Sequence, residues 1–136
     1  VGDLKTFLKE EPIKILIIDE PERIPVFRSR FEKLFGGRLQ IAVSKPNYLE
    51  LTHIEATKGN ALERLGSMLG IKKEEIIAIG DSYNDVSMIE YAGLGVAMGN
   101  APDPVKAFAR YVTKGNEEDG VAEVVERFVL KGGVLK

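Results

Sequence analysis

The spacing of apolar residues in the first 55 positions predicts one strand, one helix and one hairpin. A β-branched run, Ile-Lys-Ile-Leu-Ile-Ile, predicts a buried strand, and the apolar residues after it recur at helical spacing until Gly36-Gly37. Two further apolar runs are separated by Lys45-Pro46-Asn47, which favours a turn and therefore a hairpin. The predicted elements are the strand 13–18, the helix 22–35 and the hairpin strands 38–44 and 48–53.

After Glu55, strands and helices alternate. Thr57 is placed to cap a helix whose apolar stripe runs from Ala61 to Leu69, and Gly70 is placed to end it. Such alternation predicts a parallel sheet covered on both faces, so we expect an α/β chain with a boundary between residues 54 and 57. The predicted strands are 76–79, 94–97 and 111–113, and the predicted helices are 57–69, a short one through Val86 and Ile89, 102–110, and a last one marked by Val121, Val124, Val125, Phe128 and Val129.

A polar loop, Gly80-Asp81-Ser82-Tyr83-Asn84-Asp85, follows the predicted strand 76–79, and Gly80 is expected to let the backbone turn sharply. Open parallel sheets bind ligands at the carboxyl ends of their strands. The two carboxylates and the carboxamide of this loop are hard oxygen donors, which suit Mg²⁺. The same residues also suit an ordinary turn and helix start, but their combination arises by chance on the order of once in 10⁵ positions. The loop therefore predicts a magnesium site.

This loop and its surroundings resemble the acidic fourth motif of the haloacid dehalogenase superfamily, most closely its Cof-like sugar-phosphatase branch. The resemblance includes the strand before the loop and the segment Gly93-Leu94-Gly95-Val96-Ala97-Met98-Gly99-Asn100-Ala101 after it. Residues 44–60 are similar to the end of that branch's α/β cap and to its third motif. The resemblance implies the C-terminal part of an α/β cap domain at residues 1–55. It implies the C-terminal half of a doubly wound, Rossmann-like parallel-sheet core at residues 56–136.

The resemblance implies a Mg²⁺-dependent phosphatase of small phosphorylated metabolites such as sugar phosphates. In such a site Asp81 ligates Mg²⁺, and Asp85 either ligates it or holds its bound waters. Asn84 orients the phosphate or the acidic pair. Lys58 places its ammonium on the phosphoryl oxygens and lowers their repulsion from a carboxylate nucleophile.

Four further residues match positions near the substrate in that family. Ser44, Asn47 and Glu50 correspond to the cap side of the substrate pocket, although turn and strand-surface roles suit the same residue types. Asn100 follows Gly99 and is placed either to line the mouth of the pocket or to form a turn. All four are expected to be substrate-binding residues.

The 136 residues contain no D-x-D-G-T motif, which carries the nucleophilic aspartate in phosphatases of this superfamily. Asp19 follows a predicted strand, but the next residues are Glu20-Pro21-Glu22, so the second acid of the motif is missing. We therefore expect a C-terminal fragment that is inactive alone. The alternative is a non-catalytic module that binds a phosphorylated ligand or a protein. A receiver-type phosphoacceptor is disfavoured, because its acids come from separate strand ends whereas Asp81 and Asp85 share one loop.

Without the strand that carries the nucleophile, the predicted strand 76–79 has an unpaired edge, which invites pairing. We expect a dimer or association with the missing N-terminal half.

Composition and charge exclude several classes of binding partner and chemistry. The chain has 19 basic and 21 acidic residues and a net charge of −2, so it has no electrostatic footprint for nucleic acid or for an anionic membrane. The absence of cysteine excludes disulfides and thiolate chemistry and fits a cytoplasmic protein. No apolar run reaches the roughly 18 residues that a membrane span needs.

Overall fold

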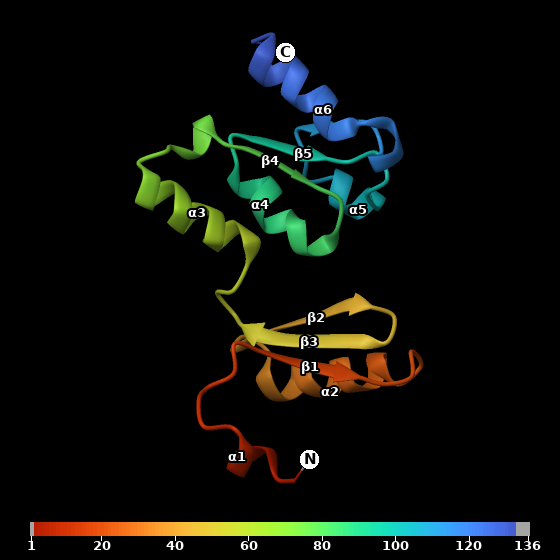
Figure 1. Ribbon diagram of the computed structural model, residues 1–136. Coiled ribbons are helices and arrows are strands. Elements are labelled where there is room, and N and C mark those ends of the chain that lie inside the picture. The colour runs from red at the N-terminus through yellow and green to blue at the C-terminus, as the bar shows by residue number, and fades with distance from the viewer. Residues whose placement is uncertain (1, 133–136) are drawn as a thin grey trace. The chain divides into compact units, whose positions relative to one another are not determined.

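The structure is a computed structural model that describes residues 2–132. The chain divides into two compact units, one ending at Ala56 and the other beginning at Thr57, and each is described here by itself (Figure 1). Their identity as cap and core stays a prediction. Among the described residues, no helix is long and apolar enough to cross a membrane.

The first unit is a three-stranded antiparallel sheet with one long helix on it (Figure 1). The helix (24–35) packs against the two hairpin strands (39–45 and 48–53), and Ile24 of the helix is buried together with Leu49 and Leu51 of the second strand. The predicted order of strand, helix and hairpin is confirmed, and the sheet order is β1-β3-β2. The elements are α1 (Leu4–Phe7), which the sequence analysis did not predict, β1 (Lys14–Ile18), α2 (Ile24–Phe35), β2 (Leu39–Lys45) and β3 (Tyr48–His53).

The prediction that the strand at 13–18 is buried was wrong. In the structure β1 is an edge strand that pairs only with β3, and Ile15, Leu16 and Ile18 are all exposed. A continuous apolar run indicates burial on both faces only when neighbouring elements cover both faces. Here α2 lies over β2 and β3, so β1 is left open among the described residues.

The second unit is an α/β sandwich around a three-stranded parallel sheet of order β4-β5-β6. The predicted α/β architecture and parallel sheet are confirmed. The strand β4 forms one edge of this sheet. The elements are α3 (Lys58–Leu69), η1 (Lys73–Glu75), β4 (Ile77–Gly80), η2 (Tyr83–Asp85), α4 (Val86–Tyr91), β5 (Leu94–Ala97), α5 (Asp103–Lys106), β6 (Tyr111–Val112), η3 (Asn116–Glu118), α6 (Gly120–Val124) and η4 (Val125–Leu130).

Both faces of this sheet are covered, as the sequence predicts (Figure 1). On one face Ala97 packs with Ile89 of α4 and Val105 of α5. On the other face Val96 packs with Val124 of α6. Neighbouring residues of a strand point to opposite faces, so the apolar strand β5 supplies both clusters and lies in the centre of the unit.

The predicted helix 102–110 is much shorter in the structure. Here α5 ends at Lys106, and beyond Ala107 the amides of Phe108 and Ala109 donate to carbonyls only three residues earlier. The Arg110 amide then donates to the Gly95 carbonyl at 2.9 Å. The chain leaves the helix early because it must return to the sheet beside β5.

Candidate active site

The start of α3 is held in place by two hydrogen bonds, which together position Lys58. The Thr57 hydroxyl accepts from the Asn60 amide at 3.1 Å, so the predicted cap is confirmed. The Gly59 amide donates to the Ser87 hydroxyl of α4 at 3.0 Å. A Cβ atom at Gly59 would lie 2.8 Å from the Ser87 carbonyl carbon, so glycine permits this close approach of the two helices.

Asp85 is the buried centre of the site. Its Oδ2 atom accepts hydrogen bonds from the amides of Asp81 and Ser82, both at 3.0 Å. Its Oδ1 atom accepts a hydrogen bond from the Lys58 ammonium, with which it forms an ion pair. The Asp85 side chain is 5% exposed whereas that of Lys58 is 50% exposed, so the ammonium is anchored on a buried carboxylate and still reaches solvent.

These contacts keep Asp85 charged. Burial raises the pKa of its carboxyl, but the Lys58 ammonium and the amides of Asp81 and Ser82 outweigh burial and hold that pKa below its usual value. The Asp85 carboxyl is therefore a carboxylate at neutral pH. A buried carboxylate so engaged serves better to fix Lys58 and the loop than to exchange protons.

Gly80 has a different role from the predicted one. It is the last residue of β4, and it is not among the glycines with positive φ, so no unusual backbone conformation requires glycine here. A Cβ atom at this position would collide with the Asp85 side chain, 2.8 Å from Cγ and 3.0 Å from Oδ2. Glycine is needed because it leaves room for the buried carboxylate.

Asp81 lies at the carboxyl end of β4 with an exposed side chain. Its Oδ2 atom accepts a hydrogen bond from the Asn100 carboxamide at 3.2 Å. The Asn100 Oδ1 atom in turn accepts from the Asn116 amide at 3.0 Å. The loops that follow β4, β5 and β6 are thus joined at one end of the sheet, where a parallel sheet places its ligands.

The donor atoms fit Mg²⁺ in part. Among residues 2–132 no cluster of three or more His, Cys, Asp or Glu side chains is arranged to hold a metal. Magnesium in phosphoryl-transfer sites is commonly bound by one or two carboxylates together with water and substrate phosphate. The exposed Asp81 carboxylate meets that requirement, whereas a cation at Asp85 Oδ1 would compete with the Lys58 ammonium.

The remaining predicted residues lie outside this hydrogen-bonded cluster. Asn84 is in η2 with an exposed side chain. In the first unit the Ser44 hydroxyl donates to Glu50 Oε1 at 2.7 Å, and Lys14 donates to Glu50 Oε2 at 3.1 Å. These bonds to Ser44 and Lys14 lower the pKa of the Glu50 carboxyl. Asn47 lies in the hairpin turn, where its carbonyl accepts from the Asp19 amide at 3.2 Å.

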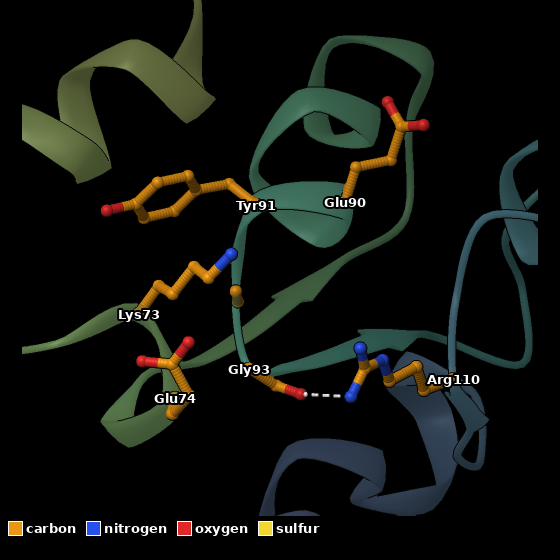
Figure 2. Close-up of a pocket in the computed structure, with 7 residues that line it drawn as sticks. Lys73, Glu74, Glu90, Tyr91, Gly93 and Arg110 are labelled. Atoms are coloured by element: carbon orange, nitrogen blue, oxygen red, sulfur yellow. Dashed lines mark hydrogen bonds between the residues drawn. The ribbon is translucent and has the colours of Figure 1, made fainter.

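A cavity of about 380 Å³ lies at the opposite end of the parallel sheet (Figure 2). Its lining comes from the end of α4, with Glu90 and Tyr91, and from residues before the strands: Lys73 and Glu74 precede β4, Gly93 precedes β5 and Arg110 precedes β6. Arg110 donates to the Gly93 carbonyl at 3.0 Å, as Figure 2 shows. None of the predicted site residues lines this cavity, so it is separate from the candidate site.

Two residues that shape the site were missed by the sequence analysis. The Ser87 hydroxyl accepts a hydrogen bond from the Gly59 amide at the start of α3, and the Asn116 backbone amide donates to the Asn100 side chain. Ser87 carries only the weak signal of a hydroxyl in the first turn of a helix. The Asn116 amide carries none, because every residue other than proline has one.

Comparisons with known proteins identify the family of the chain. Residues 2–125 match the profile of the haloacid dehalogenase-like hydrolases. The 5-amino-6-(5-phospho-D-ribitylamino)uracil phosphatases YitU and YcsE of Bacillus subtilis are 35% and 47% identical to the chain, over 94% and 68% of its length. These matches cover 48% and 37% of the two phosphatases.

A solved structure is similar over nearly the whole chain. The crystal structure of a haloacid dehalogenase-like hydrolase from Bacteroides thetaiotaomicron is 41% identical, with a TM-score of 0.80 over 94% of this chain and 48% of that one. The chain spans less than half the length of the curated relatives that it matches. From its loop chemistry, its fold and these matches together, the chain belongs to the haloacid dehalogenase-like hydrolase family.

Proposed function

We propose that this chain supplies the metal- and phosphate-binding half of a Mg²⁺-dependent phosphatase of small phosphorylated metabolites. One observation carries the proposal: the half-exposed Lys58 ammonium rests on the buried Asp85 carboxylate, and the exposed Asp81 carboxylate follows the same strand. A fixed cation and an exposed carboxylate at the carboxyl ends of parallel strands suit a phosphoryl group bridged to a metal ion.

In the proposed mechanism, each residue has one task. Asp81 ligates Mg²⁺, which when bound neutralises charge on the phosphoryl oxygens. Lys58 uses one N–H to bind Asp85 and directs the others to the phosphoryl oxygens. Asp85 fixes Lys58 and, through the amides of Asp81 and Ser82, the course of the loop. Asn84, which is exposed in the same loop, orients the phosphate.

The substrate class is proposed from the first unit and from the relatives. YitU and YcsE act, by their names, on a phosphate ester of a ribityl chain, which is rich in hydroxyl groups. In this chain Ser44 and Lys14 hold the Glu50 carboxylate, and charged groups of this kind recognise hydroxyls by hydrogen bonding. With Asn47 in the adjacent turn, Ser44 and Glu50 form the proposed recognition group for a sugar or sugar-alcohol phosphate.

The nucleophilic carboxylate of the proposed reaction is not among these residues, so we propose that the chain alone does not turn over substrate. A complementary segment with a D-x-D-G-T motif would supply the nucleophile and would pair with the open edge of β4. A cytoplasmic location is part of the same proposal, since phosphorylated metabolites are found there.

The test is complementation. The chain is assayed for Mg²⁺-dependent hydrolysis of p-nitrophenyl phosphate alone, and again after co-expression with the part of YitU that the chain does not match. We expect no turnover alone and measurable turnover in the complex. Asp81→Asn and Lys58→Met should each lower the turnover of the complex at least about 100-fold, because each removes charge stabilisation of the transition state.

Matched control variants are available on the surface. Asp103→Asn, whose side chain is 98% exposed, and Lys131→Met, which forms an exposed ion pair with Glu126, should leave turnover unchanged. Turnover by the chain alone that Asp81→Asn abolishes would overturn the proposed division of the active site. A complex that forms without any turnover would favour the non-catalytic binding module instead.

A further inference from the structure

We propose that Asn100 is a positioning residue that holds the Asp81 carboxylate for a cation and is itself held by the loop after β6. This inference rests on the proposed function, because Asp81 is its proposed metal ligand. It gives Asn100 a different role from the substrate contact that the sequence predicts. The observation behind it is a chain of two hydrogen bonds, from the Asn116 amide to Asn100 and from Asn100 to Asp81.

The two partners fix the orientation of the Asn100 carboxamide. The Asp81 carboxylate only accepts hydrogen bonds, so it must face the Asn100 NH₂ group, 3.2 Å away. The Asn116 backbone N–H only donates, so it must face the Asn100 oxygen, 3.0 Å away. Each end of the carboxamide thus has a partner within the protein, and the two bonds together fix its orientation.

The backbone on which Asn100 stands is also fixed. The Gly99 amide donates to the Lys114 carbonyl at 3.0 Å, which joins the loop after β5 to the loop after β6. A Cβ atom at Gly99 would lie 2.8 Å from the Gly115 nitrogen, so only glycine allows this approach. The backbone at Asn100 is therefore held in place, and its side chain extends to Asp81 at the end of β4.

The consequence for Asp81 is a restricted side chain. An exposed aspartate on a loop ordinarily samples several rotamers, and ordering it upon metal binding costs conformational entropy. A hydrogen bond from an anchored carboxamide holds one rotamer before the cation arrives. Residues that orient a metal ligand in this way typically change metal affinity by about 10- to 100-fold when they are replaced.

Three variants test the two hydrogen bonds of Asn100 separately. Asn100→Ala removes both hydrogen bonds. Of the two hydrogen bonds, Asn116→Pro removes only the one from the N–H that anchors Asn100. Proline fits at this position because Asn116 is the first residue of η3. The residue before it, Gly115, has φ −70° and ψ 171°, which suits a residue before proline. Asn116→Ala is the matched control, because it keeps the backbone N–H, while both variants lose the exposed side-chain contact with Glu117.

The experiment uses the full isotope-labelled chain in solution. Three-bond couplings report the χ1 rotamer of Asp81 without metal, and a titration with Mg²⁺ follows the amide signals of Asp81 and Ser82. In the wild-type chain and in Asn116→Ala we expect one dominant rotamer and the same titration midpoint. In Asn100→Ala and Asn116→Pro we expect rotamer-averaged couplings and a midpoint about 10-fold higher.

The possible failures are distinct. Unchanged couplings and an unchanged midpoint in Asn100→Ala would overturn the positioning role and leave the proposed function standing. A change in Asn100→Ala but not in Asn116→Pro would overturn the anchor in the loop after β6. If Mg²⁺ moves no amide signal of the loop in the wild-type chain, the metal site fails, and both the proposed function and this inference are overturned.

Discussion

Asp85 shows how a single buried charge is tolerated through its partners. Because its pKa is depressed in the folded chain, its contacts stabilise the fold above the ordinary aspartate pKa of about 3.9 and are lost as the pH falls through the depressed value. We expect Asp85→Asn to lower the free energy of unfolding by about 1–3 kcal/mol at pH 7, and this difference to shrink in acid. Urea unfolding followed by circular dichroism, at pH 7 and in acid, measures this difference in the free energy of unfolding, with Asp103→Asn as the control. An equal difference at both pH values would contradict the assignment.

Gly80 provides a second prediction at the scale of one residue. A methyl group there must displace the Asp85 side chain, so Gly80→Ala should lower the free energy of unfolding by about 1–3 kcal/mol, as overpacking does. Gly115→Ala is a suitable control, because φ is −70° and the nearest atom to its Cβ would be 3.5 Å away. The same denaturant series compares the two variants. If both lose equal stability, then steric conflict with Asp85 is not the reason for glycine at position 80.

At the scale of the element, α3 depends on its first turn. The Thr57 hydroxyl accepts a hydrogen bond from the Asn60 amide, and this cap lies directly before Lys58. We expect Thr57→Ala to cost about 1 kcal/mol of stability and Thr57→Ser to cost little, since serine caps equally well. Thermal unfolding of the two variants tests this. A Thr57→Ser variant as unstable as Thr57→Ala would show that the threonine methyl group matters and the cap does not.

Elements could be predicted from the sequence where local pattern determines them, and could not where neighbours do. The cap at Thr57, the helix end at Gly70 and the hairpin turn were all predicted, because each follows from residues adjacent in the chain. The exposure of β1 and the early end of α5 were not, because each depends on which element packs beside it.

The candidate site divides in the same way. Lys58, Asp81, Asp85 and Asn100 were identified from residue type and motif, and the structure brings all four into one hydrogen-bonded cluster. The partners of Lys58 and Asn100 were not predicted, because sequence spacing does not report contacts between separate loops.

At the scale of the whole molecule, each sheet has two edge strands among residues 2–132, β1 and β2 in the first unit and β4 and β6 in the second, and β1 carries exposed apolar side chains. The Asp19 amide donates to the Asn47 carbonyl just before β3, so the alternate residues Lys14, Leu16 and Ile18 direct their backbone groups away from β3. An exposed apolar edge of this kind is a template for another strand, and lysine on an edge opposes such pairing.

We therefore expect concentration-dependent association of the chain, and we expect Ile18→Lys, at a position 60% exposed, to weaken it if the contact is through β1. Light scattering after size exclusion measures both, with Val26→Lys on α2, 67% exposed and away from the edge, as the matched control. Association that Ile18→Lys leaves intact would show that the contact is not through β1, whereas a monomer at every concentration would contradict association through any sheet edge.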